Sequence, residues 1–274
     1  MSAVSGADVA AWLQVAAGAA CNICGAREEI ELPDDSGGYG HAAELRELLP
    51  CRECGGIARD RALIVALAGL LGERTPLATW TPRQTLRMFE TSGYRGHPRF
   101  LPGIFEYFNL PYAPPPEETA GAPIDARAGA DLQDLQFPDA FFSVVMTAEV
   151  LEHVADEQRA ISEIVRVLAP GGHLVLEVPY VHSFERNLVR VNRWHGRDVF
   201  LAPPEYHAEE TLVYRVYGRQ LLKDLSWAGL AVTHLVLDIP ELAITPQSVI
   251  VGTKAPFVDL AGLRVSSPLP PAPS

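Results

Sequence analysis

The chain has 274 residues, of which 48% are apolar, and it carries a formal net charge of −12. This length and composition fit one sizeable core with a small appendage, and they exclude a disordered chain. The acidic balance argues against a protein whose main task is to bind nucleic acid, because that task needs a clustered cationic surface. The first twenty residues lack a cationic segment and contain Asp8, and no later apolar run approaches the ~18 residues of a membrane span. We therefore expect a cytoplasmic protein without a membrane span.

The cysteines form two pairs with the same spacing. Cys21 and Cys24 make the first pair, Cys51 and Cys54 the second, and glycine directly follows each pair. Glycine lets the backbone turn so that both sulfurs of a pair point at one centre. We predict a zinc ribbon with a structural Zn²⁺, because four thiolates leave no open position for a substrate. Two disulfides, which a reducing compartment disfavours, and unrelated buried thiols are the alternatives.

The rest of the chain alternates helix and strand patterns. Residues 58–74 are apolar on most faces, which predicts a helix between the ribbon and the main domain. The sequence DEQRAISEIVRVLAPGG predicts a second helix, with Asp156 as N-cap and Pro170-Gly171-Gly172 at its end. GRQLLKDLSWAGL predicts a third. Six apolar runs predict strands: TLRMFE, GIFEYFNL, FFSVVMT, HLVLEVP, AVTHLVLDI and QSVIVGT.

This order of elements indicates the fold class. Strands that alternate with helices indicate an α/β protein with a mostly parallel sheet covered on both faces, and FFSVVMT should be buried on both. The last two strands, with no helix between them, predict an antiparallel closing pair. PDDSGGYG, between the cysteine pairs, indicates an elongated hairpin or insertion, and residues 113–123 a loop. The closing segment VSSPLPPAPS predicts disorder.

One long block resembles a known family. FPDAFFSVVMTAEVLEHV, then a helix and LAPGGHLVLEVP, is similar to the second half of a class I S-adenosylmethionine (SAM)-dependent methyltransferase of the type 11 group. CRECGGIARDRAL and PPEYHAEETLVYRVYGRQLL resemble a bacterial subgroup with a zinc ribbon. The resemblance implies a Rossmann-like, seven-stranded, mostly parallel sheet. We divide the chain into a zinc-ribbon region (1–57), a linking helix and connection (58–83), a SAM-binding domain (84–256) with an acceptor-pocket insertion (180–217), and a tail (257–274).

The resemblance also implies which residues meet the SAM cofactor. In the family the first strand ends in an acid, matched by Glu90, and continues into a glycine-rich turn that lets the backbone approach the cofactor. Asn109 falls near the acid that binds the ribose hydroxyls, and Asp131 and Leu132 match the pair that meets adenine. The predicted cofactor-binding residues are Glu90, Thr91, Ser92, Gly93, Gly96, Asn109, Asp131, Leu132, Thr147, Ala148 and Glu149.

The loop after the first strand departs from the family pattern. In LRMFETSGYRG, Ser92 and Tyr94 stand where glycine is usual. The interval GYRGHPRFLPG is also too short for a full first helix, because Pro102 would interrupt it. We expect weaker cofactor binding, or a loop that becomes ordered only with substrate.

Two histidines are the catalytic candidates. Methyl transfer from a sulfonium is an in-line displacement, so a base is needed only when the acceptor must lose a proton. His207, in PPEYHAEE, is the candidate base, with a hydrogen-bonded structural histidine as the alternative. His153, in VLEHV, recurs in the family, where it orients the start of the helix or lines the cofactor site. Glu149 is interpreted as a cofactor-side residue and Glu152 as a helix-surface charge.

The insertion after the fifth strand is dense in aromatic, arginine and histidine residues, and in this fold it usually lines the acceptor pocket. Its arginines suit an anionic acceptor, because guanidinium groups pair with carboxylates and phosphates. Alternatively their i+3/i+4 spacing makes them the solvated face of a helix. They are Arg186, Arg190, Arg193 and Arg197.

Three functional hypotheses follow. The leading one is a SAM-dependent methyltransferase that acts on O, N or C of a small-molecule metabolite in a biosynthetic pathway. The second is an enzyme that uses SAM for intramolecular cyclisation or aminocarboxypropyl transfer. The third is a non-catalytic adaptor whose ribbon binds a protein.

Overall fold

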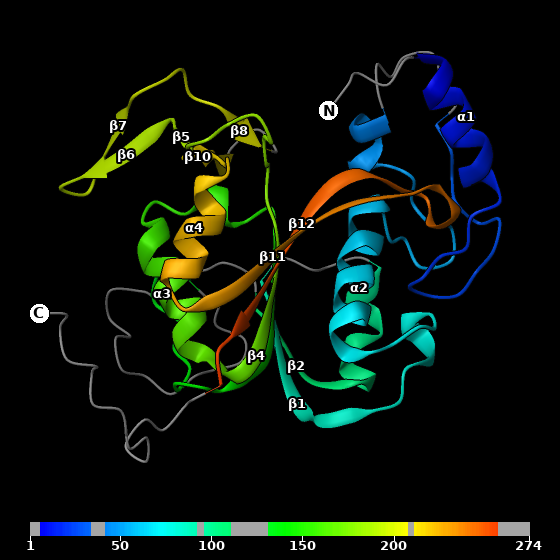
Figure 1. Cartoon of the computed structure of the whole chain (residues 1–274), viewed down its shortest axis with the longest axis horizontal. Coiled ribbons are helices and arrows are strands. Elements are labelled where there is room, and N and C mark those ends of the chain that lie inside the picture. The colour runs from blue at the N-terminus through cyan, green and yellow to red at the C-terminus, as the bar shows by residue number, and fades with distance from the viewer. Residues whose placement is uncertain (1–5, 34–41, 92–95, 111–130, 208–210, 257–274) are drawn as a thin grey trace, which may run out of the picture.

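A six-stranded sheet forms the centre of the protein (Figure 1). The computed structural model describes residues 6–33, 42–91, 96–110, 131–207 and 211–256. The sheet has the order β11-β12-β4-β3-β1-β2. Its strands are β1 (Arg83–Glu90), β2 (Phe105–Asn109), β3 (Phe142–Ala148), β4 (Leu168–Glu177), β11 (Leu230–Ile239) and β12 (Ile244–Lys254).

The pairing of the strands confirms the predicted fold class. Strands β2, β1, β3 and β4 are parallel to one another, whereas β12 is antiparallel to both β4 and β11. All six strands predicted from the apolar runs are present, and the antiparallel closing pair is confirmed. Of the seven strands that the family resemblance implies, the described residues form six.

Helices cover both faces of the sheet (Figure 1). Helix α2 (Ala58–Leu71) packs against β12 on one face, while α3 (Glu157–Val167) and α4 (Gln220–Trp227) lie on the other. Strand β3 therefore alternates between two cores: Val144 and Met146 belong to the α2 side and Val145 to the α3 side. All three side chains are buried, as predicted for a strand covered on both faces.

The segment after β1 forms two short 3₁₀ turns instead of a full helix. These turns, η3 (His97–Arg99) and η4 (Leu101–Gly103), agree with the expectation that Pro102 would interrupt a helix here. Helix α2, which precedes β1 in the chain, packs on β12 and β4 and supplies much of the helical cover on this face.

The boundaries of α3 differ partly from the prediction. Asp156 is its N-cap, since its side chain accepts a hydrogen bond from the Arg159 backbone N–H at 3.1 Å. The helix ends at Val167, however, and Pro170-Gly171-Gly172 lies within β4. Leu168 already pairs with Phe142 of β3, so sheet pairing ends the helix before the proline does.

The N-terminal region contains a helix that the sequence did not predict, α1 (Gly6–Ala17), and a 3₁₀ turn, η1 (Ala42–Glu47). The long β11–β12 hairpin reaches α1 (Figure 1). There, Trp12 Nε1 donates a hydrogen bond to Asp238 at the end of β11 at 2.9 Å. Most of PDDSGGYG, the loop at 113–123 and the tail lie outside the described residues.

The insertion 180–217 consists of short strands. They are β5 (Leu188–Val189), β6 (Val191–Trp194), β7 (Arg197–Phe200), β8 (Tyr206–His207), β9 (Thr211–Leu212) and β10 (Arg215–Val216). The helical interpretation of its four arginines is therefore wrong: β6 pairs with β7 in a hairpin, which overrides the i+3/i+4 spacing.

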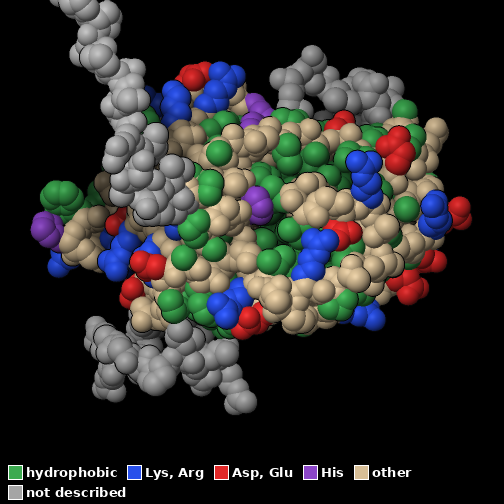
Figure 2. Space-filling view, turned by 60° about the horizontal axis from the view of Figure 1, so that its bottom comes forward, with side chains coloured by type: hydrophobic (Ala, Val, Ile, Leu, Met, Phe, Trp, Pro, Cys, Tyr) green, Lys and Arg blue, Asp and Glu red, His purple; other side chains and the backbone are tan. Residues whose placement is uncertain are grey.

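Charged side chains of both signs are interspersed over the face shown in Figure 2. In the described part of the chain, no helix has the length and apolar character needed to cross a membrane.

Arg61 of α2 connects three parts of the fold from a fully buried position. Its guanidinium donates to the backbone carbonyls of Gly56, beside the second cysteine pair, and of Ala243, in the β11–β12 turn, at 2.8 Å each. Its own carbonyl accepts from Asn22 Nδ2 at 2.9 Å. The ribbon, α2 and the β11–β12 turn are thus held together by one side chain and its backbone.

We predict that Arg61→Met lowers the free energy of unfolding by about 2 to 4 kcal/mol, because the Ala243 carbonyl loses its donor and the Gly56 carbonyl keeps only the Cys51 backbone N–H. Urea denaturation measures the change. Arg59→Met is the matched control on the same helix; Arg59 pairs with the half-exposed Glu47, so its loss should cost less than about 1 kcal/mol. Equal effects of the two substitutions would contradict the prediction.

Candidate active site

A cavity of about 290 Å³ lies at the carboxyl ends of β1 and β3. Ligands of open α/β sheets bind at such an edge. Five of the residues predicted from the sequence line it: Thr91, Asp131, Leu132, Glu149 and His153. Residues separated by more than 60 positions in the chain are therefore brought to one concave site.

Hydrogen bonds fix the walls of this cavity. Thr91 Oγ1 donates to Thr147 Oγ1 at 2.8 Å, which ties the start of the loop after β1 to β3. Opposite, Asp131 accepts from the Gln133 backbone N–H at 2.8 Å in a tight turn that holds Leu132 in a buried position. Thr147 and Ala148 are buried at the end of β3 and do not line the cavity.

Glu90 turns away from the cavity. It is 2% exposed; His97 Nε2 donates to one carboxylate oxygen at 2.6 Å, and the Tyr107 hydroxyl donates to the other. Asn109 lies opposite Glu90 at the end of β2 and is also outside the cavity lining. The acid at the end of the first strand is thus bonded to protein groups.

His97 connects Glu90 to helix α2. It is fully buried, and its Nδ1 lies 3.7 Å from Asp60 Oδ1. Burial lowers the pKa of His97, but the charge of Glu90 and the hydrogen bond to it outweigh burial, so the pKa is raised.

Gly96 makes a close contact with the cysteine region. Its φ is 68°, and a Cβ at this position would lie 2.6 Å from Gly56 Cα. Glycine is therefore needed here for packing against the turn after Cys54. Ser92 and Gly93 lie outside the described residues, so their predicted contacts with the cofactor stay predictions.

A cluster of acids and histidines borders the cavity. Arg46 of η1 donates to Glu149 at 2.9 Å and to Glu177 at 3.0 Å. Glu177 is buried, and burial followed by the charge of Glu149 raises its pKa well above the ordinary value. Arg46 and Glu177 were missed by sequence reasoning; neither has a pattern of its own in the sequence.

Glu152 corrects the sequence interpretation. It was interpreted as a helix-surface charge, but it is 0% exposed, because the chain around Tyr214 covers the turn η5 (Leu151–His153). The Tyr214 backbone N–H donates to the Glu152 carbonyl at 2.8 Å. Burial, and then the charge of Glu149, raises the pKa of Glu152 to about 8.

The two candidate catalytic histidines lie together. The rings of His153 and His207 are 4.9 Å apart. His153 Nδ1 donates to the Leu212 carbonyl on β9 at 2.8 Å, and burial lowers its pKa. His207 comes from β8, so the insertion supplies one histidine and orients the other.

Of the four arginines in the insertion, Arg193 lines the cavity. Its side chain is 53% exposed, and its Nε lies 3.8 Å from Asp198. Arg190 instead pairs with Glu205. The positively charged side chain of Arg193 therefore contributes to the wall of the cavity.

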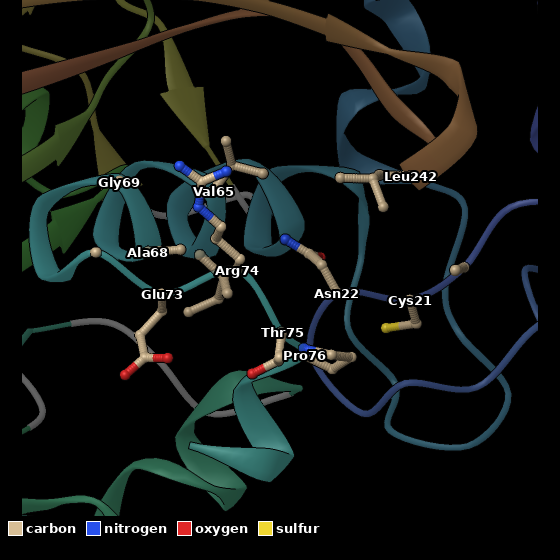
Figure 3. A pocket seen from close by; sticks show the side chains of 13 residues that line it. Cys21, Asn22, Val65, Ala68, Gly69, Glu73, Arg74, Thr75, Pro76 and Leu242 are labelled. Atoms are coloured by element: carbon tan, nitrogen blue, oxygen red, sulfur yellow. The ribbon is translucent and has the colours of Figure 1, made fainter. Parts of the chain in front are cut away.

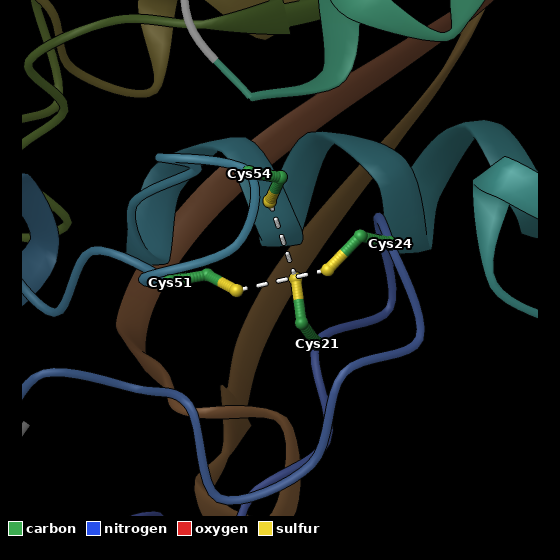
Figure 4. A group of neighbouring side chains, drawn as sticks. All are labelled: Cys21, Cys24, Cys51 and Cys54. Carbon is green, nitrogen blue, oxygen red and sulfur yellow. Dashed lines mark hydrogen bonds between the residues drawn. The ribbon is translucent and has the colours of Figure 1, made fainter.

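The four cysteines gather around one point (Figure 4). Sγ atoms are separated by 3.7 Å between Cys21 and Cys54 and by 3.6 Å between Cys24 and Cys51, and the cysteines are free of disulfides. Thiolates bound tetrahedrally at about 2.3 Å from zinc lie about 3.8 Å apart. Gly25 and Gly55, with φ of 87° and 76°, make the turns that direct each pair. The donor set fits zinc.

A second cavity, of about 500 Å³, lies between the first cysteine pair and the C-terminal half of α2 (Figure 3). Val65, Ala68 and Pro76 contribute to its lining, together with Cys21. It contains none of the predicted cofactor-binding or catalytic residues, so we assign the candidate active site to the smaller cavity.

Comparisons with known proteins find similarity to methyltransferases. Residues 117–176 match the family described as "Methyltransferase domain". A probable S-adenosylmethionine-dependent methyltransferase of Mycolicibacterium smegmatis is 36% identical over 87 residues, 32% of this chain and 29% of the relative. A demethylmenaquinone methyltransferase of Thermus thermophilus is 35% identical over 170 residues, 60% of this chain and 62% of the relative. The chain thus spans less than two thirds of either relative.

An S-adenosylmethionine-dependent methyltransferase from Mesorhizobium loti has a solved structure that aligns with this one at a TM-score of 0.44 and 18% sequence identity. The alignment covers 73% of this chain and 99% of the Mesorhizobium loti chain. The family match and the two relatives show that part of the chain, including residues 117–176, is similar to methyltransferases.

We predict a pH dependence of stability that comes from His97. Its pKa is raised in the folded protein, so its contribution is fully present below the unfolded pKa of about 6.5 and is lost as the pH rises through the folded pKa. His97→Gln keeps a donor to Glu90 but does not titrate. The unfolding free energy of the wild type should fall relative to the variant above about pH 6.5, by at most about 1.4 kcal/mol per pH unit. Urea denaturation at several pH values gives the unfolding free energy of the wild type and of the variant. The prediction would be contradicted if the two free energies changed in parallel with pH.

Proposed function

We propose that the protein transfers a methyl group from SAM to O, N or C of a small-molecule metabolite in a biosynthetic pathway. The observation that carries this proposal is the cavity that joins Thr91, Asp131, Leu132, Glu149 and His153 at the carboxyl ends of parallel strands. In it, the cofactor and the acceptor are held together so that the methyl group lies in line for attack.

We assign the cofactor to the side of the cavity formed by β1 and the 131–134 turn. Asp131 and Leu132 meet the adenine, and Asn109 the ribose. The methionine portion lies against the loop of Thr91, Ser92, Gly93 and Gly96 and the β3 end at Thr147, Ala148 and Glu149. Glu90 acts indirectly, because its bonds to His97 and Tyr107 hold the base of that loop.

We assign the acceptor to the side bordered by the insertion. His207 and His153 are the groups that promote loss of an acceptor proton there, with His153 oriented by Leu212. Arg193 favours an anionic acceptor, because it lines the cavity and guanidinium groups pair with anions. Relatives named norajmaline N-methyltransferase and 27-O-demethylrifamycin SV methyltransferase support a small-molecule acceptor.

We propose that Cys21, Cys24, Cys51 and Cys54 hold a structural Zn²⁺ in a ribbon formed by residues 1–57, followed by the linking helix. The metal stabilises the two turns that contact the main domain and leaves no position for a substrate. The sulfur separations and the paired glycine turns support this assignment.

We predict that the zinc-loaded protein binds SAM and S-adenosylhomocysteine in calorimetric titrations, and that Asp131→Ala weakens both by at least about tenfold, as for the loss of a charge-assisted hydrogen bond. Asp134→Ala is the matched control in the same turn: Asp134 is outside the cavity lining. Binding that is unaffected by Asp131→Ala would contradict the assigned adenine site. Turnover that yields methylthioadenosine instead of adenosylhomocysteine would indicate another use of SAM, and no binding would favour the adaptor.

We also predict that chelation releases one Zn²⁺ per chain and lowers both the affinity for SAM and the melting temperature. The reason is that Gly56, beside the second cysteine pair, packs on Gly96 at the end of the cofactor loop. Metal analysis gives the zinc content, and calorimetry and thermal unfolding before and after chelation give the two effects. An unchanged melting temperature after complete zinc loss would contradict a structural role.

A further inference from the structure

Glu152, His153 and His207 have the mutual geometry of metal ligands. Their ligand atoms all lie within 4.8 Å of one another. Glu152 Oε1 is 3.6 Å from His153 Nε2 and 3.9 Å from His207 Nδ1. A cation with bonds of about 2.1 Å joins ligand atoms up to about 4.2 Å apart, so the carboxylate can share a cation with either histidine, and small side-chain adjustments bring all three into contact with one ion.

Glu152 is the observation that calls for a cation. Its side chain is 0% exposed, and neither carboxylate oxygen has a hydrogen-bond partner among the described residues. In its ionised form, a buried carboxylate without donors is strongly unfavourable unless it is paired or coordinates a metal. Arg46 does not supply the partner, because it bonds Glu149 and Glu177 instead.

His153 is oriented as a ligand. Its Nδ1–H donates to the Leu212 carbonyl at 2.8 Å, which leaves Nε2 with a lone pair on the side of Glu152. A backbone carbonyl that binds the other ring nitrogen is the usual support of a metal-binding histidine.

Glu149 adds a second carboxylate. Its Oε1 accepts from Arg46, while its Oε2 lies 4.0 Å from His207 Nδ1. Glu149 and His153 both line the candidate cofactor cavity, so a cation held here borders that cavity and keeps positions open toward it.

We propose that Glu152, His153 and His207 bind a divalent cation at the edge of the cavity, with the carboxylate of Glu149 beside it. The mixed carboxylate and imidazole donors suit Mn²⁺, Fe²⁺ or Co²⁺, in contrast to the four thiolates of the ribbon, which suit Zn²⁺. This site is separate from the cysteine cluster and uses none of its ligands.

If the protein has the proposed methyltransferase function, a cation at this position indicates which chemical class of acceptor is methylated. A hydroxyl oxygen on an open coordination position has a lowered pKa and loses its proton to water. The oxygen then attacks the methyl carbon: the O–CH₃ bond forms as the S–CH₃ bond breaks, and the products are a methyl ether and S-adenosylhomocysteine. The two histidines promote proton loss as ligands of the cation, and the acceptor is an alcohol or phenol.

Titration of the zinc-loaded protein with Mn²⁺ alone, followed by electron paramagnetic resonance, tests the site. Mn²⁺ is chosen because thiolates compete poorly for it. We expect one Mn²⁺ per chain, with nitrogen couplings from imidazole. Glu152→Gln, which keeps the shape but not the charge, should weaken binding by at least about 100-fold. His153→Asn, which retains a donor for Leu212, should weaken binding to a similar extent and remove one nitrogen coupling.

Glu163→Gln and His173→Asn are the matched controls outside the cluster and should bind Mn²⁺ as the wild type does. Failure of the wild type to bind Mn²⁺, or equal binding by Glu152→Gln, would overturn the site. If Glu152→Gln does not fold, His153→Asn decides the same question. SAM binding is measured in parallel. Mn²⁺ binding without SAM binding supports the cation site and rejects the methyltransferase function. SAM binding without Mn²⁺ binding rejects the cation site and supports the methyltransferase function.

Discussion

The contact between the second cysteine turn and the segment after β1 is the constraint on which the candidate site depends. Gly96 lies too close to Gly56 for a side chain at position 96, and His97 connects Asp60 of α2 to Glu90 of β1. Because the Gly56 carbonyl also accepts from the buried Arg61, the cysteine cluster, α2 and the segment that begins at Gly96 form one packed unit. We therefore expect a metal bound by the cysteines to act on the candidate active site through packing.

The N-terminal region also shapes the electrostatics of the site. Arg46 reaches from η1 to Glu149 and Glu177, so it compensates two acids at the ends of β3 and β4. Glu152 is left without a donor, and the insertion then covers it and brings His207 beside it. The buried carboxylate of Glu152 thus lies next to the cavity, where the ribbon region, the sheet and the insertion meet.

Much of the fold could be predicted from local patterns. FFSVVMT is apolar on both sides because β3 is covered on both faces, and Asp156 caps α3 through a bond three residues away. The paired cysteines predicted a common centre because their spacing and glycines define each turn locally. The end of α3 was predicted wrongly, since pairing of Leu168 with Phe142 is a contact between distant residues. The strands of the insertion were also missed, because their pairing with other segments is not visible in a local pattern.

The sequence by itself determined the order of the six sheet strands and the pairing of the cysteines around one centre, because these depend on periodicity and short spacings. Only the tertiary structure decided that Glu90 is bonded to His97 and Tyr107, that Arg46 compensates Glu149, and that Glu152 is buried beside two histidines. Burial and partners are set by chain segments that are far apart in sequence, and the chemistry of a carboxylate follows from them.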